Sequence, residues 1–103
     1  MTIIYRPLGR VSNIIQATGL EMSYAYDDLV FADNSVFLIR FDEKLENSIH
    51  LFFNTDCIET EKVRLEKLLR DAAKVEKFKI ASVGLFSLKQ LDEKEELEIE
   101  FMV

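Results

Sequence analysis

The chain has 103 residues, of which 49% are hydrophobic and 31% are charged, and its formal net charge is −6. This composition is typical of one compact folded domain, residues 1–103, and excludes an intrinsically disordered chain. The excess of acid disfavours nucleic acid and anionic membranes as partners, because both carry negative charge. No apolar run approaches the roughly 18 residues that cross a bilayer, and the amino terminus has no signal-peptide pattern. The single Cys57 cannot form an internal disulfide, so we expect a soluble protein of a reducing compartment, the cytoplasm.

The first expected element is a helix that starts near Pro7, because proline suits the first turn of a helix. Gly19 follows where a residue of left-handed conformation would end it. Between these two positions, residues recur at helical spacing: Leu8, Val11, Ile14, Ile15 and Thr18.

Four strands are expected next, joined as an antiparallel meander. Segments 29–32 (LVFA) and 36–41 (VFLIRF) are apolar at successive positions, as in strands that are covered on both faces. The turn 33–35 joins them, with Asn34 tolerant of a positive φ. Segment 48–53 (SIHLFF) follows the charged loop 42–47. Before all of these, the segment 20–27 alternates with period two and predicts a strand with one buried face, made of Leu20, Met22, Tyr24 and Tyr26.

A second helix is predicted directly after segment 48–53. Asn54, Thr55 or Asp56 is expected to cap it, and Glu66 and Arg70 have the favourable i,i+4 order for an ion pair. Its apolar stripe consists of Ile58, Leu65, Leu68, Leu69, Ala72 and Val75.

The period returns to two after the second helix. Segment 77–89 predicts a long strand in which Gly84 marks a bulge or a close approach. Segment 96–103 predicts a last strand, joined to it as a hairpin and lying at an edge of the sheet. Glu98 and Glu100 on that strand would discourage indiscriminate pairing at the edge.

The elements therefore follow the order α-β-β-β-β-α-β-β. This order predicts an α+β fold in which two helices cover one face of a mostly antiparallel sheet of about six strands. Strands that are apolar on both faces also need a cover for the second face. We expect the chain's own long strands, a second copy or a partner to supply it, so an uncovered face would be an interaction site. Tyr24 and Tyr26 would line it with their hydroxyls at a wet rim.

The adjacent Asp27 and Asp28 have two interpretations. Aspartate is favoured in turns because its side chain accepts hydrogen bonds from nearby backbone N–H groups. In a turn the two carboxylates could also converge on a ligand or a hard cation. No calcium-loop spacing surrounds them, so the turn is the interpretation we adopt.

His50 and Cys57 are the only histidine and cysteine of the chain, seven residues apart. A thiol in the first turn of a helix has a lowered pKa, and a histidine within hydrogen-bond reach would make the two a nucleophile pair. A lone cysteine is also a small buried hydrophobe, which is the reading we adopt. One histidine and one cysteine supply half of a zinc shell, and no glycine-rich phosphate loop or GxSxG motif is present. We therefore expect no cofactor, metal site or catalytic residue.

Three hypotheses for function follow. The one we adopt is a small protein-binding or adaptor module that acts as a homodimer. The second is a small-ligand-binding or carboxylate-dependent enzyme domain with a pocket between helix and sheet. The third is a secretion-chaperone-like client binder: the order of elements resembles that of bacterial secretion chaperones of the type III class, and this resemblance implies a homodimer that wraps an extended client. The chain departs from that class in an additional early strand and in the lack of a closing helix.

Overall fold

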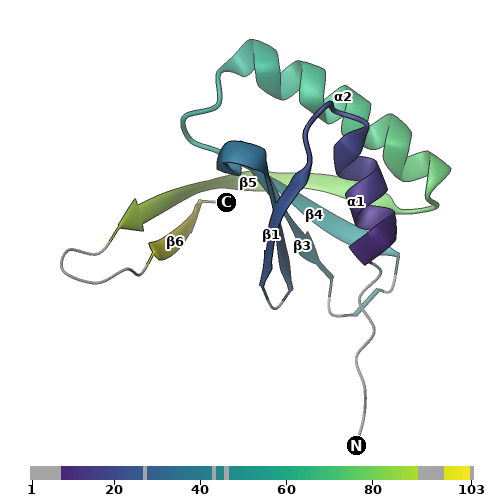
Figure 1. Ribbon diagram of the computed structural model, residues 1–103, viewed down its shortest axis with the longest axis horizontal. Helices are drawn as coiled ribbons and strands as arrows, with labels where there is room; N and C mark the ends of the chain where they lie inside the picture. Colours follow the sequence, from purple (N-terminus) through teal and green to yellow (C-terminus); the bar gives the residue numbers. More distant parts are fainter. Residues whose placement is uncertain (1–7, 27, 43, 46, 91–96, 103) are drawn as a thin grey trace, which may run out of the picture.

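The computed structural model of the chain describes residues 8–26, 28–42, 44–45, 47–90 and 97–102 (Figure 1). These residues confirm the α+β class and the predicted order α-β-β-β-β-α-β-β. The helices are α1 (Leu8–Gln16) and α2 (Glu59–Val75), with a short 3-10 turn, η1 (Asp33–Ser35). The strands are β1 (Met22–Tyr26), β2 (Leu29–Ala32), β3 (Phe37–Phe41), β4 (Ser48–Asn54), β5 (Lys79–Gln90) and β6 (Leu97–Met102).

The strands form one sheet in which they lie side by side in chain order, from β1 to β6. Neighbouring strands are antiparallel except β4 and β5, which are parallel. α2 is the crossover that such a parallel pair requires. β6 lies at one edge of the sheet, as predicted, and β1 lies at the other. In Figure 1, β6 and the end of β5 project away from the helices.

Both helices pack on the same face of the sheet and enclose a helix-side core. The apolar spacing of α1 is confirmed, since its three regularly spaced aliphatic residues are buried, and Gly19 follows it with a φ of 89°. Within the described residues, no helix is long and apolar enough to cross a membrane. The buried part of the helix-side core consists of Val11, Ile14, Ile15, Val30, Ala32, Phe37, Ile39, Phe41, Ile49, Leu51, Phe53, Leu65, Leu69, Ala73 and Phe78.

α2 begins later than the sequence predicts. The residue before its first turn is Ile58, which makes no side-chain capping bond and is 64% exposed. Asn54 instead orders the loop before the helix, because its Oδ1 accepts the N–H of Asp56 (2.9 Å) and its Nδ2 donates to the carbonyl of Ser35 (2.9 Å). The prediction of a cap within 54–56 was therefore wrong. The predicted ion pair of Glu66 and Arg70 is confirmed, at 2.7 Å.

Two predicted backbone irregularities are confirmed. Asn34 lies in the turn between β2 and β3 with a φ of 58°. In β5 the register shifts at Gly84: Leu51 pairs with Ser82, whereas Phe52 pairs with Gly84. The extra residue is a β-bulge, which bends the strand and increases its twist.

Arg10 links α1 to the turn between α2 and β5. Its guanidinium donates a hydrogen bond to the carbonyl of Glu76 and lies 4.6 Å from the ring centroid of Phe78. Asn13 on the same helix donates to Oε1 of Glu76 (3.1 Å). These contacts fix the short first helix against the end of the second.

We predict that Arg10→Ala lowers the free energy of unfolding by about 1 kcal/mol, since it removes a hydrogen bond and a cation–π contact between distant segments. Arg70→Ala is the matched control. Its exposed i,i+4 ion pair is expected to contribute less than about 0.5 kcal/mol. Urea unfolding followed by circular dichroism measures both, and equal effects would contradict the role given to Arg10.

Candidate functional site

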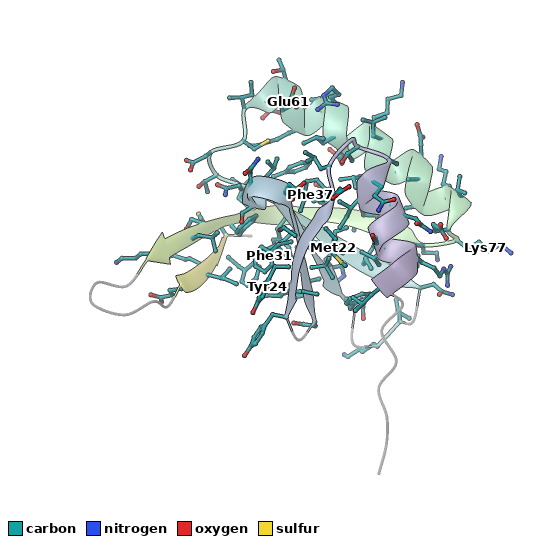
Figure 2. All side chains as sticks on the ribbon, viewed as in Figure 1. Met22, Tyr24, Phe31, Phe37, Glu61 and Lys77 are labelled. Carbon is teal, nitrogen blue, oxygen red and sulfur yellow. The ribbon has the colours of Figure 1, made fainter. Side chains whose placement is uncertain are left out.

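The face of the sheet opposite the helices carries a second apolar cluster, which we call the aromatic face. No residue of α1 or α2, as far as the structure describes them, belongs to it. In Figure 2, Phe37 lies nearer to α2 than Phe31 and Tyr24 do; Phe37 belongs to the helix-side core and Phe31 to the aromatic face. The aromatic face consists of buried Phe31, Leu38, Phe52 and Phe86 and of partly buried Leu29, Val83, Leu88, Ile99 and Phe101.

The sheet curls around the aromatic face. The ring centroids of Phe31 on β2 and Phe86 on β5 are 6.2 Å apart, although three strand spacings in a flat sheet amount to about 14 Å. Phe52 on β4 and Phe101 on β6 are 4.8 Å apart. This curvature is how Phe52 and Phe86 become fully buried although neither α1 nor α2 packs on them. The chain's own strands therefore cover the centre of the second face.

Arg40 on β3 lies at the rim of the aromatic face. Its guanidinium carbon is 5.0 Å from the ring centroid of Phe52 and 5.5 Å from that of Phe101. These distances are typical of cation–π contacts. Sequence reasoning missed this residue. The available signal was a single charge inside the otherwise apolar segment VFLIRF.

β1 forms an exposed edge beside this face, which we call the tyrosine edge. Tyr24 and Tyr26 are 57% and 63% exposed, and their rings are stacked with centroids 6.5 Å apart. The ring of Tyr24 also packs near that of Phe31, with the two centroids 6.2 Å apart. The tyrosines thus extend the aromatic face into solvent.

The alternation predicted for the first strand was wrong in one respect. Met22 packs against the helix-side core, but Tyr24 contacts the aromatic face on the opposite side. The register between β1 and β2 shifts between these two residues, at Ser23. The hydroxyl of Ser23 is within hydrogen-bond distance of the carbonyls of Phe31 (3.3 Å) and Ala32 (3.0 Å). An inserted residue reverses the facing of every later side chain in a strand, which is why the tyrosines leave the core.

His50 on β4 also points to the side of the aromatic face, since its neighbours Ile49 and Leu51 belong to the helix-side core. Its Nε2 lies 3.3 Å from Oδ2 of Asp42. Its Nδ1 is buried and has no hydrogen-bond partner in the part of the chain that the structure describes.

Asp42 is engaged mainly by the loop that follows β3. Its Oδ1 accepts the backbone N–H groups of Lys44 (2.8 Å) and Leu45 (3.1 Å). These two hydrogen bonds, with a smaller contribution from the neighbouring His50, lower the pKa of the Asp42 carboxyl below its ordinary value. The carboxylate therefore stabilises the loop as an anion.

Cys57 lies on the other side of the sheet from His50. It is half-buried against the helix-side core and precedes α2, and its thiol lies 3.8 Å from the carbonyl of Ile58. Burial raises the pKa of the Cys57 thiol, the reverse of what a position in the first helical turn would do. The two residues that sequence considered as a nucleophile pair are therefore not brought together.

Asp28 lies in the turn of the hairpin between β1 and β2, where Tyr26 pairs with Leu29. Its carbonyl accepts the N–H of Phe41 (2.9 Å), which ties the turn to β3. Asp27 lies outside the described residues. Over the described ranges, no group of three or more His, Cys, Asp or Glu side chains could hold a metal ion.

Comparison with family models, curated proteins and solved structures finds no match for this chain. The resemblance to secretion chaperones is therefore one of element order alone.

We predict that substitutions at Phe52, within the aromatic face, and at Tyr24, at its border, differ sharply in their effect on stability. Phe52→Ala is expected to lower the free energy of unfolding by about 3–5 kcal/mol, because it empties a fully buried position. Tyr24→Ala is expected to change it by less than about 1 kcal/mol in the monomer, because more than half of this side chain is already in water. Denaturant unfolding at low protein concentration compares them, and a large loss in Tyr24→Ala would show that the edge is structural.

The lowered pKa of Asp42 predicts a pH dependence of stability. A carboxyl whose pKa is lower in the folded than in the unfolded state stabilises the fold above its ordinary value of 3.8, and this contribution is lost as the pH falls through the folded pKa. Asp42→Asn retains an oxygen acceptor but removes the charge. We expect it to be less stable than the wild type near about pH 7 and the difference to shrink near about pH 2.5. An unchanged difference in urea unfolding at the two pH values would contradict this.

Proposed function

We propose that this domain is a non-enzymatic protein-binding module that acts as a homodimer, and that two copies pair through the tyrosine edge. The observation that carries the proposal is an edge strand with two exposed, stacked tyrosines, adjoining an aromatic face to which neither α1 nor α2 contributes. A cytoplasmic location belongs to the proposal, since the lone thiol of Cys57 would stay reduced there.

The two edges of the sheet differ in how they are protected. An edge strand presents unpaired backbone N–H and C=O groups to any other strand, and proteins guard such edges with charges, proline or bulges. β6 carries Glu98 and Glu100, and both are exposed. β1, with the sequence MSYAY, carries no charge and no proline, and its bulge lies near its start, before the tyrosines. The stretch from Tyr24 to Tyr26 is thus the less guarded of the two edges.

A second copy is the partner that suits this strand. A strand can pair with its own copy in antiparallel orientation about a two-fold axis, which gives a closed dimer. With the axis at Ala25, Tyr24 of one protomer lies opposite Tyr26 of its partner. Aromatic cross-strand pairs stabilise antiparallel strands, and no like charges would face each other. The two sheets would become one continuous sheet, with the two aromatic faces side by side.

Sedimentation velocity over a range of protein concentrations tests this proposal. We expect the wild type to sediment as a dimer and Ala25→Lys to sediment as a monomer, because two lysines would meet at the axis. Ala17→Lys is the matched control, since Ala17 is an exposed alanine in the turn after α1, outside β1, and we expect its substitution to leave the dimer intact. A wild type that stays monomeric at high micromolar concentration would contradict the proposal.

A cysteine at position 25, on the proposed two-fold axis, tests the pairing of the two β1 strands independently. In a Cys57→Ser background, Ala25→Cys is expected to form an intermolecular disulfide on mild oxidation, since facing residues of paired strands lie within the roughly 4.4–6.8 Å that a disulfide spans. Ala17→Cys is expected to form none under the same conditions. If the protein is still a dimer but Ala25→Cys does not cross-link, the proposed homodimer is retained and pairing through the tyrosine edge is excluded.

The enzyme or ligand-binding hypothesis is not the one we favour. It needs Asp28, His50 or Cys57 to converge on one pocket, but Asp28 occupies a hairpin turn and the other two lie on opposite faces of the sheet.

A further inference from the structure

One edge of β5 pairs with a neighbouring strand along only half of its length. β4 pairs with β5 from Lys79 to Phe86, whereas β6 pairs with it only from Leu85 to Gln90. Within the described ranges, the stretch Lys79–Gly84 therefore has a neighbouring strand on one side only. We call this stretch the open edge of β5, and it spans roughly 20 Å at about 3.3 Å per residue.

The backbone of the open edge is available for pairing. Lys79 donates its N–H to the carbonyl of Asn47 (2.8 Å), on the side of β4. Successive residues of a strand direct their N–H and C=O groups to opposite edges, so those of Ile80 and Ser82 are directed to the unpaired side. Ala81 and Ser82, which face opposite sides of the sheet, are both exposed to solvent.

Two grooves run along the open edge, and α2 forms their other wall. The larger, of about 600 Å³, is lined by residues that include Val63, Lys67, Arg70 and Lys74 of α2 and Ile80 of β5. The smaller, of about 270 Å³, continues past Ser82 to Leu85. A strand added at the open edge would therefore lie against the flank of α2.

The charge of the larger groove indicates which kind of segment would bind there. Lys67, Arg70, Lys74 and Lys79 line it together with only two acids, Glu66 and Asp71. One of these acids, Glu66, is already paired with Arg70 at 2.7 Å. In a chain of net charge −6, this is a locally basic groove, and it favours an acidic segment.

β6 itself displays the pattern that the open edge requires. Ile99 and Phe101 belong to the aromatic face, so Glu98 and Glu100 are directed to the face of the helices. A strand added in line with β6 along the open edge would likewise direct alternate side chains to the aromatic face and to the face of the helices. Its apolar residues would extend the aromatic face, and its acidic residues would meet the lysines of α2.

We infer that the open edge of β5, with the larger groove beside it, docks an extended segment of a partner protein in which acidic and apolar residues alternate, added as a strand in the line of β6. Strand addition of this kind takes its affinity from backbone hydrogen bonds and its specificity from alternate side chains. This site is separate from the tyrosine edge and goes beyond the proposed dimer, which leaves it free in both protomers.

Fluorescence anisotropy with two end-capped, labelled hexapeptides tests the inference. The acidic probe has the sequence of residues 97–102, LEIEFM, and the basic probe is LKIKFM. We expect the wild type to bind the acidic probe and Lys67→Glu to bind it at least about fivefold more weakly. Lys44→Glu makes the same charge change at an exposed lysine outside both grooves and is expected to leave the affinity within about twofold.

Ser82→Pro tests the backbone part of the site. It removes an N–H directed to the open edge, so we expect the acidic probe no longer to bind while the circular dichroism spectrum is unchanged. If this variant does not fold, the comparison of Lys67→Glu with Lys44→Glu decides alone. Any of three results overturns the inference: no binding of the acidic probe to the wild type, equal losses in the two lysine variants, or equal affinity for both probes. The same titration in the Ala25→Lys background separates the two proposals, since binding that survives there does not depend on the dimer.

Discussion

The structure depends on burying both faces of its central strands, although the two helices that it describes pack on one face. α1 and α2 cover one face, and the other is buried because the sheet curls until side chains of β2 and β5 touch, as Phe31 and Phe86 do. Burial of apolar surface is the dominant favourable contribution to folding, so curvature of this kind replaces a third layer. It covers the centre of the face and leaves the rim, where Tyr24 and Tyr26 lie in water.

The bulges in β1 and β5 contribute to the same curvature of the sheet. Each inserts one residue, and each adds local bend and twist to a strand that borders the aromatic face. The bulge at Ser23 also reverses the facing of β1, so that the tyrosines join the aromatic face and not the helix-side core. A single inserted residue thus moves the tyrosines from the expected buried face of the strand to its opposite face.

Asp28, Asp42 and Cys57 each have a place in the local structure. Asp42 accepts two backbone N–H groups of its own loop, Asp28 lies in a hairpin turn, and Cys57 is half-buried with a raised pKa. A sheet is a barrier between its two faces, and it separates Cys57 from His50. Among the described strands, backbone edges are left unpaired at β1 and β6 and along half of β5. Both proposals therefore concern strand pairing, not catalysis.

Local patterns in the sequence determined the elements, their order and their class, because periods of 3.6 and 2 report directly on which residues must leave water. They also located the turn at Asn34, the left-handed Gly19 that follows α1 and the bulge at Gly84, where backbone conformation depends on single residues. The start of α2, the bulge at Ser23 and the role of Arg40 were decided only by tertiary structure. Each depends on contacts between distant segments, such as Asn54 with Ser35 and Arg40 with Phe101. The curl of the sheet, the face of the tyrosines and the unpaired half of β5 follow from how six strands meet, and no local period encodes that.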